Sequence, residues 1–92
     1  MQDNQSSSET ITAIHLGSPY KVILFNDDFH TMEEVAAQIV KATGFPRSKA
    51  FRITVEADEK GRAIVWVGHF ERAEHISQVL EEIRLGTKIE PA

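Results

Sequence analysis

Residues 20–40 read YKVILFNDDFHTMEEVAAQIV, and this stretch decides the fold because it changes from a strand pattern to a helix pattern. Its first six residues, 20–25, are mostly β-branched, aliphatic or aromatic and lie between Pro19 and the polar residues 26–28. Such a run predicts a strand, and because its apolar residues barely alternate with polar ones, it predicts a central strand. Asn and Asp residues favour turns, so residues 26–28 suit the exit from that strand.

A helix signature follows the turn. Thr31 and Glu34 form a capping box, in which each side chain binds the backbone N–H of the other residue. Apolar residues then recur at helical spacing, namely Met32, Val35, Ala36, Ile39 and Val40. Gly44 follows them and predicts the end of the helix, because glycine readily adopts the left-handed backbone of a helix cap.

The segment 47–59 fits two patterns. Pro46 suits the first turn of a helix, and helical spacing is kept by Ala50, Ile53, Thr54 and Ala57. A strand-like alternation is equally present at Phe51, Ile53, Val55 and Ala57. The β-branched run 53–55 favours the strand, with a hairpin loop over residues 58–61. Pattern alone leaves the two interpretations open.

The rest of the chain predicts a strand over residues 62–67 (RAIVWV) and a helix over residues 70–85. The inner face of that helix carries Ala73, Ile76, Val79, Leu80 and Ile83. Gly86 ends it, and residues 87–90 can add a short final strand. The order β-α-(α or β)-β-α-β predicts an α+β sandwich, with helices on one face of a three- or four-stranded sheet.

Composition narrows the class of protein. A chain of 92 residues, 41% of them apolar, forms one domain with one modest core. Residues 1–18 contain no Lys or Arg and few apolar side chains, so we expect a mobile tail before a core domain over 19–92. The basic residues are scattered and no apolar run is long enough to cross a membrane. We therefore expect a soluble intracellular domain without nucleic acid or membrane as a partner.

Motifs for catalysis or metal binding are not evident. The sequence has no cysteine, no glycine-rich phosphate loop and no serine with a plausible base. Metal-ligand spacing is also lacking among the histidines, which are His15, His30, His69 and His75. We therefore expect no metal, no cofactor and no enzymatic activity.

The one dense polar cluster is Asn26, Asp27 and Asp28. Taken alone, it is most simply a solvated turn. The functional interpretation is a site for an amine or another cation, because two carboxylates and an amide carbonyl supply acceptors for the three donors of an ammonium group. Apolar Phe25, Phe29 and Met32 lie beside the cluster, which suggests a polar mouth over an apolar hollow.

Residues 20–35, YKVILFNDDFHTMEEV, resemble the start of the ClpS family, adaptors of the Clp ATP-dependent protease, where the family pattern reads approximately YKVILxNDDYTPMEFV. The resemblance covers most of the chain from Pro19 onward and includes Gly61-x-Ala63 and Ala73-Glu74. It implies a helix over residues 46–59. The implied fold is thus β-α-α-β-α-β, with three helices on one face of a three-stranded antiparallel sheet.

The resemblance also implies a function. ClpS-like proteins bind substrates whose N-terminal residue is bulky and apolar (an N-degron) and deliver them to a Clp AAA+ unfoldase. The implied partner is the N-terminal domain of a ClpA- or ClpC-like unfoldase, met by a monomeric adaptor in the bacterial cytoplasm rather than the plastid stroma. The tail, residues 1–18, matches the extension that the family uses during delivery.

By position, Asn26 and Asp28, with Asp27 alongside, match the residues that hold the free α-amine. Asp58 occupies the place of a family histidine that also binds the amine. The implied hydrophobic pocket comprises Phe25, His30, Met32, Val35, Thr54, Ala57 and Leu85.

Two departures in this pocket imply a changed preference. Thr54 stands where the family has a methionine and Ala57 where it has a valine, so we expect a wider and more polar pocket that favours Trp or Phe or admits side chains that the usual pocket rejects. The alternative is a divergent protein-interaction domain of the same fold that no longer reads N-termini. The C-terminal domain of the bacterial ribosomal stalk protein, which is similar in arrangement, recruits its partners through exposed helices. The Asn26-Asp27-Asp28 cluster with Met32 favours the adaptor, because a domain that recruits partners through exposed helices does not require it.

Overall fold

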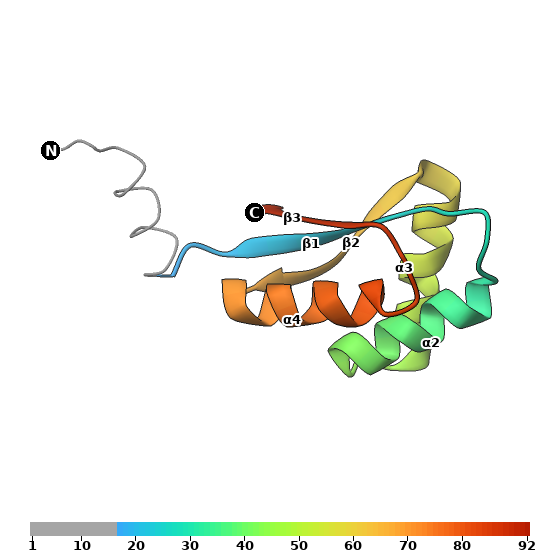
Figure 1. Cartoon of the computed structure of the whole chain (residues 1–92), viewed down its shortest axis with the longest axis horizontal. Helices are drawn as coiled ribbons and strands as arrows, with labels where there is room; N and C mark the ends of the chain where they lie inside the picture. Colours follow the sequence, from blue (N-terminus) through green and yellow to red (C-terminus); the bar gives the residue numbers. More distant parts are fainter. Residues whose placement is uncertain (1–16) are drawn as a thin grey trace, which may run out of the picture.

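The computed structural model describes residues 17–92, so most of the predicted tail over 1–18 lies outside the described residues. The elements follow in the order β1 (Tyr20–Phe25), α2 (Met32–Thr43), α3 (Arg47–Lys60), β2 (Arg62–Gly68), α4 (Phe70–Glu81) and β3 (Thr87–Pro91). The strands form an antiparallel sheet in the order β2-β1-β3, and the helices lie on one face of it (Figure 1). The predicted α+β architecture and the central position of the first strand are confirmed.

The start of α2 is the predicted capping box. The hydroxyl of Thr31 accepts a hydrogen bond from the Glu34 N–H at 3.1 Å, and the Glu34 carboxylate accepts one from the Thr31 N–H at 2.8 Å. Gly44 ends the helix with a left-handed backbone, at φ 78°. A capping side chain stabilises a helix by about 1 kcal/mol, so the local sequence fixes where α2 begins.

The ambiguous segment is the helix α3. Its buried residues, Ala50, Thr54 and Ala57, lie on one stripe that faces the rest of the domain. Gly61 caps the helix at φ 88°, and its N–H donates to the Ala57 carbonyl oxygen at 2.8 Å. Burial of that stripe outweighs the strand preference of the β-branched residues, which depends on context.

The predicted helix over 70–85 is too long, because α4 ends at Glu81. A turn follows in which Arg84 has a left-handed backbone at φ 66°. The apolar spacing of Ile83 continued the helical pattern past the true end. The turn has a structural consequence, since it lets Leu85 leave the helix direction and become 97% buried, at 3% exposure.

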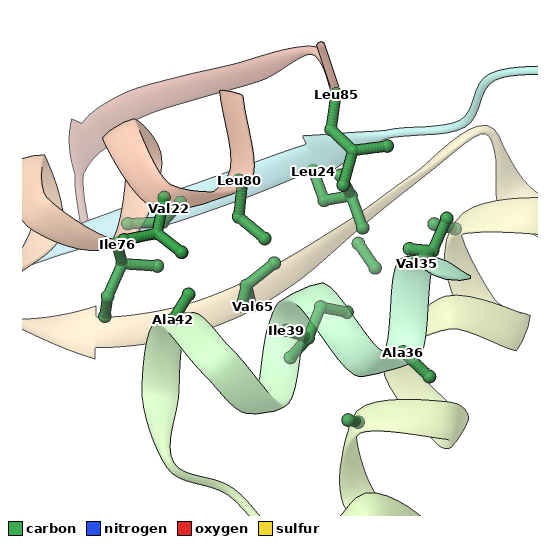
Figure 2. Packing of buried hydrophobic residues seen from close by; sticks show 14 of the residues in the cluster. Val22, Leu24, Val35, Ala36, Ile39, Ala42, Val65, Ile76, Leu80 and Leu85 are labelled. Carbon is green, nitrogen blue, oxygen red and sulfur yellow. The ribbon is translucent and has the colours of Figure 1, made fainter. Parts of the chain in front are cut away.

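The core lies between the sheet and the helices. Its fully buried members include Val22 and Leu24 of β1, Ile39 of α2, and Ile76 and Leu80 of α4 (Figure 2). Burial of such a side chain stabilises the fold by about 1.5–3 kcal/mol. Within residues 17–92, no helix has both the length and the apolar character needed to cross a membrane.

Candidate functional site

The end of β1 is held between two loops. The N–H of Phe25 donates to the Gly86 carbonyl oxygen, and the N–H of Asn26 donates to the Gly61 carbonyl oxygen, each at 3.0 Å. Gly61 follows α3, and Gly86 precedes β3. These two bonds bring the loop before α2, the end of α3 and the turn before β3 to one place.

A hollow opens at this junction. It encloses about 330 Å³ of space, counted with its open mouth, and it is lined by Leu24, Phe25, Asn26, Asp27, His30, Met32, Val35, Thr54, Ala57, Asp58 and Leu85. Ten of the eleven residues that the sequence nominated therefore lie around one hollow. Leu24 was not nominated, although its inward position, two residues after Val22 on β1, was a usable signal.

The floor of the hollow is apolar and belongs to the core. Leu24, Val35, Ala57 and Leu85 are each at most 8% exposed. In Figure 2, Leu24 extends from β1, Val35 from α2 and Leu85 from the turn after α4. Three elements distant in sequence thus build a surface suited to an apolar side chain.

The mouth of the hollow is polar. Asn26 and Asp58 are exposed. The hydrogen bonds and ion pairs formed within residues 17–92 include neither of these two side chains. Their oxygens therefore remain available to accept hydrogen bonds from a cationic donor.

Asp27 organises the loop beside the mouth. One of its carboxylate oxygens accepts from the N–H groups of Phe29 and His30, both at 2.9 Å. The other oxygen lies 2.7 Å from Nδ1 of the His30 ring. Burial alone would raise the pKa of Asp27, but the bonds from His30 and Phe29 outweigh it and hold that pKa below its ordinary value. The ionised carboxylate therefore fixes both the turn and the His30 ring.

Asp28 is the one nominated residue that is not part of the hollow. It is exposed and does not line the cavity. The reason is the turn itself, because Asp27 binds the N–H groups two and three residues later and Asp28 lies at the apex between them. The amine-binding role that the resemblance implies for Asp28 stays a prediction, and its side chain lies outside the lining of the hollow.

Thr54 adds little free polarity to the hollow. Its hydroxyl donates to the Ala50 carbonyl oxygen one turn earlier in α3, at 2.9 Å. That hydroxyl hydrogen is therefore already used within the helix, and the more polar hollow stays a prediction that rests on the hydroxyl oxygen as an acceptor. What Thr54 and Ala57 contribute is small side-chain volume.

The arrangement suits the binding of a ligand. Among the described residues 17–92, no group of three or more His, Asp or Glu side chains is placed to hold a metal ion. The hollow instead joins acceptors for a cationic group to an apolar floor. A ligand that carries an amine directly beside an apolar side chain matches both features.

Comparisons with known proteins identify the family. Residues 16–86 match the family model described as the ATP-dependent Clp protease adaptor protein ClpS. A ClpS adapter protein of Thermosynechococcus vestitus is 40% identical over 73 residues, which cover 78% of this chain and 76% of the relative. One of Nostoc sp. is 43% identical over 67 residues, covering 72% of this chain and 69% of the relative.

A solved structure of a ClpS protein has the same fold. Agrobacterium tumefaciens ClpS2 bound to L-phenylalaninamide superposes with a TM-score of 0.76 at 25% identity, covering 82% of this chain and 98% of that one. The fold, the family model and the relatives all indicate the ClpS family. This chain belongs to the ClpS family of adaptor proteins of the ATP-dependent Clp protease.

Proposed function

We propose that the hollow binds the N-terminal residue of an N-degron substrate. The α-amine lies at the mouth, where Asn26 and Asp58 accept its hydrogen bonds, and the first side chain enters the apolar floor. The observation that carries the proposal is that one hollow combines polar acceptors at its mouth, whose side chains form no hydrogen bond within residues 17–92, with four buried apolar residues below.

The ligand of the A. tumefaciens ClpS2 supports this proposal. L-Phenylalaninamide carries a free α-amine, a benzyl side chain and a carboxamide that stands in for the first peptide bond. It is therefore the smallest mimic of a peptide that begins with Phe. A site for it needs the two features that the hollow of this chain combines.

Asp27 has a supporting role in this proposal. One of its oxygens accepts from the Phe29 and His30 N–H groups and the other contacts the His30 ring, so it supplies negative charge near the mouth and holds His30 in place. Met32 and Phe25, both half-buried, form the rim between mouth and floor.

The small residues of α3 set the preference for the first side chain. Thr54 and Ala57 leave more room than the Met and Val expected from the family resemblance, so Trp and Phe are preferred to Leu. An aromatic ring buries more apolar area than an aliphatic side chain where the hollow is wide enough to admit it.

The same proposal covers delivery. The adaptor acts without catalysis, as a monomer in the bacterial cytoplasm, and brings the bound substrate to the N-terminal domain of a ClpA- or ClpC-like unfoldase. Residues 1–18 act in delivery and residues 19–92 bind. A variant lacking residues 1–18 is therefore expected to bind N-degron peptides normally and to fail in substrate degradation by the reconstituted protease.

Fluorescence anisotropy with labelled peptides that differ only in residue one tests the binding proposal. The panel is Phe, Trp, Tyr, Leu, Ile and Ala. Binding of the Phe and Trp peptides, with Leu weaker and Ala weakest, is expected. Absence of binding across the panel contradicts the proposal and favours an interaction domain that does not read N-termini.

A further inference from the structure

A histidine lines the hollow that we propose for the N-terminal residue. His30 lies in the loop before α2, and its side chain is 20% exposed. The two other histidines within residues 17–92, His69 and His75, are exposed and do not line the hollow. Histidine is the side chain that ordinarily changes its charge between about pH 5 and pH 8. The lining of the hollow therefore contains one group whose charge depends on pH in this range.

The bond between His30 and Asp27 determines which ring nitrogen carries a hydrogen. Nδ1 of His30 lies 2.7 Å from the second oxygen of the Asp27 carboxylate. An ionised carboxylate has no hydrogen to donate, so Nδ1 carries the hydrogen and donates it. In the neutral ring, Nε2 then has no hydrogen and is free to accept one.

The nitrogen Nε2 is not engaged within the described part of the chain. Among the side-chain hydrogen bonds and ion pairs of residues 17–92, the His30 ring takes part through Nδ1 alone. Protonation at Nε2 therefore breaks no bond of the loop, and the bond from Nδ1 to Asp27 is kept. The ring can change its charge while the walls of the hollow stay in place.

The charged groups around His30 determine what its protonation does. Asp27 from the same loop and Asp58 from α3 are the carboxylates of the lining. Arg84, from the turn after α4, lines a second hollow together with His30 and is positive at every pH of interest. A protonated ring offsets one of the two carboxylates, so the hollow becomes less negative.

We propose that His30 sets the affinity of the hollow for the α-amine, which binds tightly when the ring is neutral and weakly when it is protonated. This inference rests on the proposed function. The amine and the ring share one hollow, and two positive charges in it repel each other. By linkage, the amine weakens proton binding at Nε2 by the same factor, so peptide binding in mild acid releases a proton.

Fluorescence anisotropy at two pH values tests the proposal. The probe is a labelled peptide that begins with Phe and contains no acidic residue and no histidine. Its α-amine, with a pKa of about 7.7–8.0, stays charged below about pH 7. Wild type is expected to bind it about three- to tenfold more weakly at about pH 5.5 than at about pH 7. The difference shrinks when salt is raised to about 0.5 M.

Two variants assign the effect to one histidine. His30→Gln keeps a side chain that can donate to Asp27 but cannot take up a proton, so its affinity is expected to be nearly equal at the two pH values. The matched control is His75→Gln, which removes an exposed histidine of α4 that does not line the hollow and is expected to keep the wild-type ratio.

Proton release gives a second readout. Calorimetric titration of wild type at about pH 6, in two buffers that differ in heat of ionisation, should show a proton released on peptide binding, and His30→Gln should show none. Equal binding of wild type at both pH values, or an unchanged ratio in His30→Gln, contradicts the role of His30 and leaves the proposed function standing. If wild type does not bind the Phe peptide at about pH 7, both proposals fail.

Discussion

The floor and the mouth of the hollow differ in how the rest of the molecule depends on them. Leu24, Val35, Ala57 and Leu85 are shared with the hydrophobic core, so the surface that we propose receives a side chain also holds the fold together. Asn26 and Asp58 at the mouth are exposed and carry no side-chain bonds within residues 17–92. Ligand selection and stability are therefore coupled at the floor and separable at the mouth.

This difference explains where sequence change is tolerated. A floor residue is constrained twice, by packing and by the ligand, whereas a mouth residue is constrained by the ligand alone. Asp58, at the position where the family resemblance implies a histidine, is thus compatible with an intact fold. Thr54 and Ala57 are compatible because smaller side chains widen the hollow without placing a charge in it.

The largest effect is expected from Leu85→Ala. Removing a buried leucine costs about 2–5 kcal/mol in the free energy of unfolding, through lost burial and the cavity left behind. Because Leu85 also lines the floor, binding of a Phe peptide by the folded fraction should weaken too. Urea unfolding and anisotropy measure the two quantities.

Leu80→Ala is the matched control for that loss. Leu80 is fully buried but does not line the hollow, so a similar loss of stability should leave the affinity of the folded protein unchanged. Equal losses of affinity in both variants would contradict the placement of Leu85 in the floor.

Thr54→Met should change selectivity by a smaller amount. The added volume enters a position that is 4% exposed, and overfilling such a site costs about 1–3 kcal/mol. Trp peptides should therefore lose affinity relative to Leu peptides. Thr54→Val, which removes the hydroxyl at constant size, should retain the preference for Trp. An unchanged ratio of Trp to Leu peptide affinities in Thr54→Met would show that α3 does not restrict the size of the first side chain.

Asp58→Asn should weaken peptide binding by about 1 kcal/mol or less, because the lost charge interaction is exposed to solvent. The free energy of unfolding should change little. Glu59→Gln makes the same change of charge at an exposed neighbour that does not line the hollow, so it should leave affinity unaltered. A larger loss of peptide affinity in Glu59→Gln than in Asp58→Asn would contradict the placement of Asp58 at the mouth.

The smallest effect is a pH dependence at Asp27. Its pKa is lowered from 3.8 in the folded protein, so its ionised form stabilises the fold above that pH, and the contribution disappears as pH falls through the lowered pKa. The stability advantage of wild type over Asp27→Asn should therefore shrink in acid. Urea unfolding over a series of pH values measures this, and an advantage that stays constant as pH falls would contradict the stabilising role of ionised Asp27.

The sequence was sufficient for the parts of the fold that carry local signals. Thr31 and Glu34 mark the start of α2, and Gly44 marks its end, because caps depend on residues only a few positions apart. The segment of α3 was ambiguous from pattern, since its β-branched residues fit both periods. The buried stripe through Thr54 decides it, and that stripe depends on tertiary packing.

Two features were not predicted, for different physical reasons. The end of α4 was placed four residues late because Ile83 keeps helical spacing, whereas the turn at Arg84 depends on Leu85 being drawn into the core. Within the polar cluster, Asp27 and Asp28 are chemically alike. Only the hydrogen bonds of Asp27 to the following backbone separate the organising residue from the exposed one.

The most direct test of the account compares a Phe-initiated peptide with its N-acetylated form on wild type and on Asp58→Asn. Acetylation removes the positive charge and leaves the acceptors at the mouth without a partner, so wild type should bind the free peptide at least about tenfold more tightly. In Asp58→Asn the difference in affinity between the free and the acetylated peptide should be smaller. Equal binding of free and acetylated peptides by wild type would contradict the central claim that the mouth reads the α-amine.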